Sequence, residues 1–199
     1  MEEATRRTVL ALAMPMVLLA VAGCEAATAT SGPGGDMNPA DLEFVTQAYN
    51  IITFDREEGS LAPAYAQSPA VRKIAAELLN NANAFATKLD PIVKAHGINM
   101  PTELRTDLRV RLLHIRLDRG LYFDHSFIDD QIVSHQEALD RREMFVGTPG
   151  QNPQLRALAK EGIEEVRQSL AELRVIQRQL PTPPTMVGPF GLPPLPHTE

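Results

Sequence analysis

Apolar residues recur every three to four positions through most of this chain, and this helical period constrains the fold more than any other feature. The pattern runs from Asn38 to about Leu180. Over the same region, no run of alternating β-branched and polar residues is long enough to propose a strand. Amphipathic helices must bury their apolar faces against one another, so the sequence predicts an all-α fold.

Three of the helical segments begin with a polar capping residue followed by proline, at Asn38-Pro39, Ser68-Pro69 and Asn152-Pro153. A polar N-cap satisfies free backbone N–H groups, and proline fits the first helical turn. The patterns predict helices over residues 39–62, 69–96, 102–117 (with Thr102 as N-cap), 120–146 and 153–180. The most economical packing is an antiparallel four-helix bundle with the short segment as an extra helix.

The N-terminus has the composition of an export signal. Two arginines precede an apolar run of 14 residues, Val9 to Ala22, which is shorter than the roughly 20 residues of a membrane-spanning helix. The run leads into Leu19-Ala20-Val21-Ala22-Gly23-Cys24, which resembles the lipobox of bacterial lipoproteins, whose cysteine becomes the acylated first residue of the mature protein. We predict a signal peptide over residues 1–23 and lipidation of Cys24. The alternative is an ordinary signal peptide with a chance cysteine.

This anchor predicts an exported protein that faces the periplasm. Glu25 is not the aspartate that resembles an inner-membrane retention signal in enteric bacteria, so the outer membrane is favoured. Small residues predict a flexible tether over residues 24–37, and seven prolines predict a disordered tail over residues 181–199. The helical-bundle domain is expected between them, over residues 38–180.

Composition excludes several classes of function. The chain has 19 Lys and Arg against 25 Asp and Glu, and its formal net charge of −6 argues against a general nucleic-acid binder. A single cysteine rules out a disulfide framework, a cysteine-based zinc site and an iron–sulfur cluster held within one chain. We find no glycine-rich phosphate loop or nucleophile elbow, and therefore predict no enzymatic activity and no cofactor.

Five short motifs in a fixed order resemble those of a bacterial family. They are Gly59-Ser60-Leu61-Ala62 with Ser68-Pro69-Ala70-Val71-Arg72, Gly97-Ile98-Asn99-Met100-Pro101, Phe123-Asp124-His125-Ser126-Phe127, Gln131-Ile132-Val133-Ser134-His135 and Asn152-Pro153-Gln154-Leu155. Over about residues 40–180 the chain resembles domain of unknown function 4142, a group of exported, ferritin-like four-helix proteins. The resemblance implies export, a bundle fold and an unassigned activity.

The chain also departs from this family. Members usually carry an Asp-His pair in the second helix, where this sequence has Asn81 and Ala82, and a histidine near Ser169. His135 alone remains. If the histidines of the family form a metal or cofactor site, the resemblance implies that this chain has lost most of it.

His135 is the strongest candidate for a functional residue. Its helical spacing with apolar neighbours predicts that it faces the interior, and Asp55 falls on the inner stripe of the first helix with Glu58 beside it. A buried carboxylate–imidazole pair would shift both pKa values and could serve as a pair of metal ligands. The alternative, which we favour, is a core histidine satisfied by one hydrogen bond.

Two further groups carry charge at helical spacing. Asp124, His125, Asp129 and Asp130 either hold a cation, with His125 and Asp129 four residues apart, or complement a helix dipole. A ferritin-type di-iron site is excluded because no Glu-x-x-His occurs. The second group comprises Arg105, Arg109, Arg116 and Arg119, which fall on one helical arc. They would contact anionic headgroups or an anionic envelope polymer, or else pair with Glu161, Glu164, Glu165 and Glu172.

Together these features predict a lipid-anchored helical-bundle protein of the bacterial cell envelope. Its expected role is binding or envelope support without catalysis. Its expected partners are the membrane, through acylated Cys24, and an envelope protein or anionic polymer. The alternative function is a small metal- or cofactor-binding bundle centred on His135 with Asp55 or Glu58.

Overall fold

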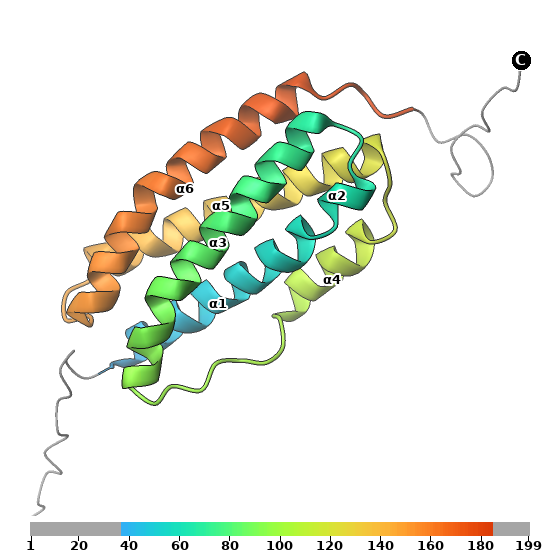
Figure 1. Ribbon diagram of the computed structural model, residues 1–199. Helices are drawn as coiled ribbons and strands as arrows, with labels where there is room; N and C mark the ends of the chain where they lie inside the picture. The colour runs from blue at the N-terminus through green and yellow to red at the C-terminus, as the bar shows by residue number, and fades with distance from the viewer. Residues whose placement is uncertain (1–36, 185–199) are drawn as a thin grey trace, which may run out of the picture. The chain divides into compact units, whose positions relative to one another are not determined.

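The computed structural model describes residues 37–184 of the chain (Figure 1). These residues form six helices and no β-strand: α1 (Pro39–Gly59), α2 (Ala62–Tyr65), α3 (Pro69–Ala95), α4 (Thr106–Ile115), α5 (Leu121–Gly147) and α6 (Pro153–Gln179). The prediction of an all-α fold is therefore confirmed. No helix in this described range is long and apolar enough to cross a bilayer.

The Asn-Pro and Ser-Pro pairs start helices as predicted. α1, α3 and α6 each begin at the proline, with the preceding residue as N-cap. At α1 the cap is reciprocal: Asn38 Oδ1 accepts from the Asp41 backbone N–H, and the Asp41 carboxylate accepts from the Asn38 N–H, both at 2.9 Å. Such a capping box satisfies two otherwise unpaired donors.

Two predicted helices differ from the observed ones. The segment 39–62 is not continuous, because α1 ends at Gly59 and Pro63 lies in the separate turn α2. The segment 102–117 was predicted too long at both ends, and Thr102 is not its N-cap. α4 starts instead after Arg105, whose backbone N–H donates to Asn50 Oδ1 at 2.7 Å. A contact with α1, which the local sequence does not reveal, sets this helix boundary.

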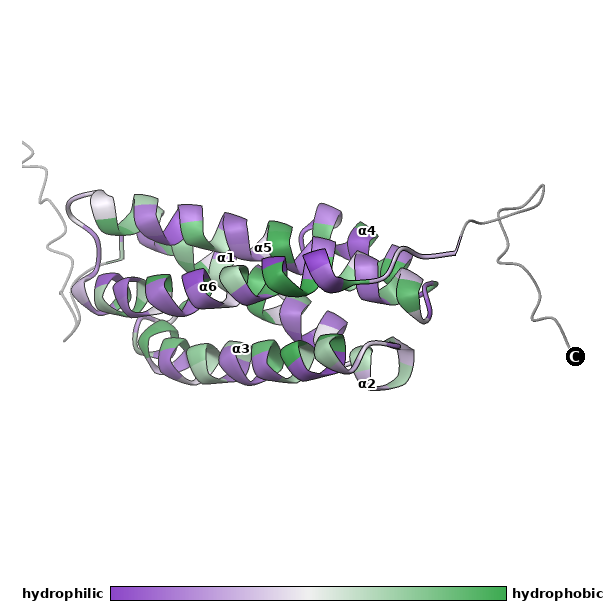
Figure 2. Cartoon of the chain, turned by 90° about the horizontal axis from the view of Figure 1, so that it is seen from above, coloured by the Kyte–Doolittle hydropathy of each residue, from purple (hydrophilic) through white to green (hydrophobic). Residues whose placement is uncertain are grey.

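The four long helices lie side by side (Figure 1). α1 packs against α3 and α5, α6 packs against the same two helices, and α4 lies against α1 and α5. Figure 1 shows α1 and α6 running in one direction and α3 and α5 in the other. Hydrophobic and hydrophilic residues alternate in bands along each long helix (Figure 2). The inward bands form two apolar clusters, one around Phe54, Phe123 and Phe127 and one around Phe44, Phe85 and Phe145.

Buried carboxylates hold the starts of helices that are distant in sequence. The Asp41 carboxylate, which caps α1, also accepts from the Asn152 backbone N–H at 2.9 Å, at the start of α6. Asp124 on α5 accepts from the N–H groups of Gln67 and Ser68, at 3.1 and 2.8 Å, at the start of α3. Charge-assisted bonds of this kind are stronger than neutral ones. They fix the axial positions of neighbouring helices as well as their ends.

We expect Asp41→Ala to lower the free energy of unfolding by about 2 kcal/mol, because it leaves N–H groups at two helix starts without an acceptor. Urea denaturation followed by circular dichroism measures this loss. The matched control is Asp140→Ala on the exposed face of α5, where a change within about 0.5 kcal/mol is expected. Equal losses in the two variants would show that the double cap contributes nothing specific.

Candidate functional site

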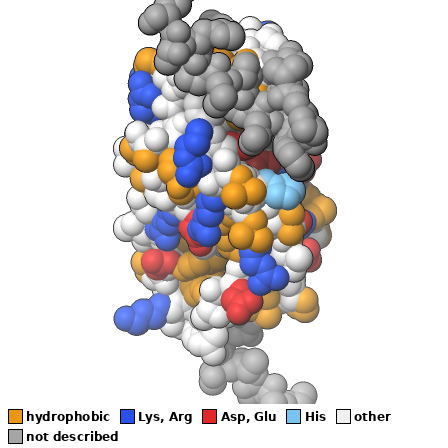
Figure 3. Space-filling model, turned by 90° about the vertical axis from the view of Figure 1, so that its right-hand side faces the viewer, with side chains coloured by type: hydrophobic (Ala, Val, Ile, Leu, Met, Phe, Trp, Pro, Cys, Tyr) orange, Lys and Arg blue, Asp and Glu red, His pale blue; other side chains and the backbone are white. Residues whose placement is uncertain are grey.

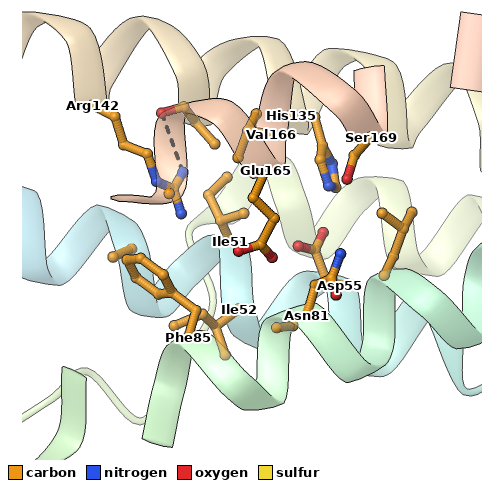
Figure 4. Close-up of a pocket in the computed structure, with 15 residues that line it drawn as sticks. Ile51, Ile52, Asp55, Asn81, Phe85, His135, Arg142, Glu165, Val166 and Ser169 are labelled. Carbon is orange, nitrogen blue, oxygen red and sulfur yellow. Dashed lines mark hydrogen bonds between the residues drawn. The ribbon is translucent and has the colours of Figure 1, made fainter. Parts of the chain in front are cut away.

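The four long helices enclose a small pocket of about 40 Å³, which we call the interhelical pocket (Figure 4). Its walls are partly apolar, with Ile51, Ile52 and Phe85 among them. The polar and charged residues that line it are Asp55 from α1, Asn81 from α3, His135 and Arg142 from α5, and Glu165 and Ser169 from α6. All four long helices therefore contribute a polar side chain to the same place.

His135 is held in one tautomer. The residue is only 7% exposed, and Nδ1 lies 3.0 Å from the backbone oxygen of Gln131. A carbonyl oxygen can only accept, so Nδ1 carries the proton and Nε2 keeps a free lone pair. Burial, together with the positive charge of Arg142, lowers the pKa of His135 to about 4. The imidazole is therefore neutral at pH 7.

Asp55 shares the pocket with His135, and Figure 4 shows its carboxyl beside Asn81 and below His135 and Ser169. The residue is 6% exposed, and Oδ1 has no hydrogen-bond partner. Burial raises the pKa of Asp55 to about 7, although a hydrogen bond from Gln131 and the charge of Arg142 act in the opposite direction. Asp55 is thus a carboxyl group poised between its acid and its anion near neutral pH.

Glu58 does not line the interhelical pocket. It is fully buried and accepts a hydrogen bond from Gln131 Nε2 at 2.5 Å. Burial raises the pKa of Glu58 well above its usual value. Gln131 thus lies between Glu58 and His135: its backbone oxygen accepts from His135 Nδ1 and its side-chain amide donates to Glu58. The carboxyl that shares the pocket with His135 is Asp55.

Arg142 brings a positive charge to the pocket. Its guanidinium lies 4.6 Å from the centre of the Phe85 ring and donates to the backbone oxygen of Ala138 at 3.2 Å. Gly162 on α6 makes this possible, since a Cβ there would lie 2.8 Å from Arg142 Nε. Burial lowers the pKa of Arg142, and the negative charges of the half-buried Glu165 and of Asp55 act in the opposite direction.

One comparison with known proteins identifies the family. The sequence profile described as "Domain of unknown function (DUF4142)" matches residues 26–176, which is most of the chain. The chain belongs to the DUF4142 family. Searches of curated proteins and of solved structures each find no match.

The departures of this DUF4142 protein from the expected family pattern fall in one place. Asn81, Ala82 and Ser169, the positions where the resemblance implies Asp, His and His, all line the interhelical pocket with His135. Sequence reasoning singled out these positions only as departures, and it missed Arg142 and Glu165 as lining residues. The signal was present, because Asn81 precedes a buried alanine and Ser169 precedes a buried leucine, so both lie at the edge of an inward stripe.

The second group of predicted metal ligands in this DUF4142 protein is not brought together. Asp124 caps α3, His125 Nε2 lies 2.8 Å from the backbone oxygen of Pro181, Asp129 accepts from Gln177, and Asp130 lies 3.7 Å from Arg111. In residues 37–184 as a whole, no three His, Cys, Asp or Glu side chains lie close enough to hold a metal ion. The structure thus gives each of these four side chains a separate partner, and a cation site at this group stays a prediction.

The predicted arginine stripe does not exist as one helical arc. α4 covers only Thr106–Ile115, so Arg105, Arg116 and Arg119 lie outside it. The Arg105 guanidinium donates hydrogen bonds to the carboxylates of Glu137 and Asp107. The pKa of Glu137 is lowered by its hydrogen bond from Arg105.

The other arginines of this group also have local partners. Arg109 lies 3.6 Å from Glu103, and Arg116 donates to Glu57 at 2.8 Å. Arg119 lies 3.4 Å from the centre of the Tyr65 ring and donates to two backbone oxygens. The expected partners Glu161, Glu164, Glu165 and Glu172 belong to α6, and three of them pair with other cations: Glu161 with Lys88, Glu164 with Arg167 and Glu172 with Lys73. The predicted pairing was wrong because the position of α4 against α1 and α5 is a tertiary property.

Cys24 and the residues after Pro184 lie outside the described part of the chain. The predicted lipidation site, signal peptide and tether, and most of the proline-rich tail, therefore stay predictions.

The opposite pKa shifts of Asp55 and His135 predict opposite pH dependences. Asp55 keeps its proton up to about pH 7 in the folded state, whereas its ordinary pKa is 3.8. Between pH 3.8 and about 7 the folded state therefore binds more protons than the unfolded state, and this carboxyl makes the free energy of unfolding fall as the pH rises. The pKa of His135 drops from 6.5 to about 4, so the imidazole makes the free energy rise over that range. Each unit of pKa difference corresponds to about 1.4 kcal/mol.

Relative to the wild type, we therefore expect Asp55→Asn to gain stability as the pH is raised from 4 to 7 and His135→Gln to lose it from 4 to 6.5. Urea titrations at several pH values, with a chelator present, measure both differences. Asp140→Asn, on the exposed surface, should run parallel to the wild type. Parallel curves for all three variants would contradict the assigned protonation states.

Proposed function

We propose that this protein is an exported, lipid-anchored helical-bundle protein of a bacterial cell envelope, and that it acts by binding rather than by catalysis. The lipobox-like sequence before Cys24 supports the anchor, and the small residues after it support a tether. Membership of the DUF4142 family, an uncharacterised domain, is consistent with this role. In this proposal the outer membrane holds the acyl chains and the domain faces the periplasm.

We further propose that the long helices form an antiparallel, ferritin-like four-helix bundle. Two hairpins support this arrangement: α1 with α3, and α5 with α6. The connection between the hairpins, residues 96–120, is the one long crossover in the described range and carries α4. Ferritin-like bundles are distinguished from simple up-and-down bundles by one such crossover.

The observation that carries the binding role is an exposed apolar stripe on and after α4, formed by Val110, Leu113 and Leu117. These side chains are 44%, 56% and 81% exposed. Val110 and Leu113 are three residues apart on one side of α4, and Leu117 follows in the turn just after the C-terminal end of the helix, with Arg109 and Arg116 as chain neighbours. Exposed large apolar groups that gather in one place are typical of interaction surfaces.

Figure 3 looks at the end of the domain near α2 and the C-terminal end of α4, where hydrophobic side chains and Lys or Arg side chains lie next to one another. A partner for this surface would combine apolar contacts with negative charge. An envelope protein with an acidic, apolar patch fits, and so does an anionic envelope polymer with apolar substituents. The arginines have carboxylate or aromatic neighbours already, so the apolar stripe would supply most of the binding free energy.

The anchor is tested with Cys24→Ser in the native host. We expect loss of radiolabelled fatty acid from the protein and a shift from the membrane fraction to the soluble fraction. Both results follow because Cys24 carries the acyl chains, which take up the label and bind the protein to the membrane. The circular dichroism spectrum of the variant reports whether the helical domain is intact. A labelled, membrane-bound Cys24→Ser protein would refute lipidation at this position.

The binding surface is tested with a photo-crosslinking amino acid placed at Leu113 and, separately, at Leu117. In intact cells we expect a discrete crosslinked product from both positions. The matched control position is Val175 on α6, which is 42% exposed but lies outside the stripe, and it should give no such product. Identical patterns at all three positions, or none at Leu113 and Leu117, would contradict the proposed surface.

A second candidate function is a metal- or cofactor-binding bundle at His135 with Asp55. One observation favours it: the free Nε2 of His135 and the unpartnered Oδ1 of Asp55 face the same pocket. A metal-binding histidine commonly donates its other N–H to a backbone oxygen, as His135 does to Gln131. Metal content of the protein from native membranes, compared with His135→Ala, separates this candidate from the first.

A further inference from the structure

Four polar side chains from four different helices meet in the interhelical pocket. They are Asp55 of α1, Asn81 of α3, His135 of α5 and Ser169 of α6, and Figure 4 shows them pointing toward one another. Asp55, His135 and Ser169 are buried, and Asn81 is half-buried. A polar layer across an apolar core requires hydrogen-bond partners inside that layer.

The protein itself does not supply enough of these partners. Asp55 Oδ1 is buried without any hydrogen bond. The side chains of Asn81 and Ser169 bond to no other group in residues 37–184, and His135 uses Nδ1 while Nε2 remains free. Leaving a buried carboxyl oxygen such as Asp55 Oδ1 unpaired is costly, and together with the unused hydrogen-bonding capacity of the three neighbouring side chains it points to a partner that is not part of the chain.

The size of the pocket limits what this partner is. A water molecule needs roughly 10–15 Å³ of space accessible to its centre, so the volume of about 40 Å³ suits one to three waters. Organic ligands and cofactors occupy pockets of about 300–1,000 Å³. The pocket is therefore an order of magnitude too small for them.

The chemistry of the lining favours water over a metal ion. His135 Nε2 only accepts, whereas the Asn81 amide, the Ser169 hydroxyl and a protonated Asp55 both donate and accept, which matches the mixed capacity of water. The guanidinium of Arg142 lines the same pocket and repels a cation. Burial also favours the protonated form of Asp55, and a metal ion would have to displace this proton before it could bind the carboxylate.

We propose that the interhelical pocket is a hydration site, in which one to three ordered waters bridge Asp55, Asn81, His135 and Ser169 and so connect all four long helices. The site does not depend on the proposed envelope function. It explains how a bundle of this kind accommodates a buried carboxyl group and a buried imidazole without pairing them to each other directly.

The first test is a high-resolution crystal structure of the mature protein, grown without added metal and with anomalous data collected. We expect isolated density in the pocket within about 2.7–3.2 Å of at least two of the four side chains, without an anomalous signal. An anomalous peak at about 2.0–2.2 Å from His135 Nε2 would overturn the proposal in favour of a metal. Direct bonds among the four side chains with no density between them would overturn it as well.

The second test uses matched serine variants in solution. Ser169→Ala removes a pocket group, whereas Ser134→Ala removes another buried hydroxyl, which donates to the Gln131 backbone oxygen and does not line the pocket. In the wild type we expect a magnetisation-transfer signal between long-lived water and the His135 ring. Ser169→Ala should weaken it at least twofold, and Ser134→Ala should leave it unchanged.

Absence of the signal from the wild type, or equal signals in the two variants, would overturn the hydration site. Near-stoichiometric metal in the wild type that disappears in His135→Ala would also overturn it, and would establish the second candidate function instead. Because neither result bears on Cys24 or on the α4 stripe, failure here is distinguishable from failure of the envelope proposal.

Discussion

Polar groups buried in this fold are costly to leave unpaired, and the arrangement of the helices follows from how partners are supplied to most of them. Asp41 and Asp124 are fully buried carboxylates, yet each accepts backbone N–H groups at the start of another helix. The same carboxylate that satisfies a helix end therefore fixes that end against a second helix. Apolar burial supplies most of the driving force, but it has no direction along the helix axis.

The polar groups deeper in the core are accommodated in their uncharged forms rather than as ion pairs. Burial raises the pKa of Asp55 and Glu58 and lowers that of His135, so all three shift toward their uncharged forms. Gln131 lies between them and binds on both sides, with its side-chain amide on Glu58 and its backbone oxygen on His135. The surface follows the opposite rule, since arginines such as Arg105 keep their charge and pair with exposed or half-buried carboxylates.

Several elements were predictable residue by residue. The pairs Asn38-Pro39, Ser68-Pro69 and Asn152-Pro153 start helices because capping and the fixed backbone angle of proline act within one turn. The wrong prediction of the start of α4 also has a definite physical origin. α4 begins at Thr106, because the Arg105 N–H is bound by Asn50 across the helix interface. A contact between residues 55 positions apart leaves no mark in the local pattern.

The sequence by itself determined the helical class, the starts of three long helices and the inward direction of His135, because each depends on a period or a cap that acts over a few residues. The tertiary structure alone decided which side chains meet. It brought Asn81 and Ser169 to Asp55 and His135, left Glu58 outside the pocket, and paired Arg116 with Glu57 on α1. Helical periodicity determines which face of a helix is buried, but the rotation and axial shift of one helix against another depend on the packing and capping contacts of the whole core.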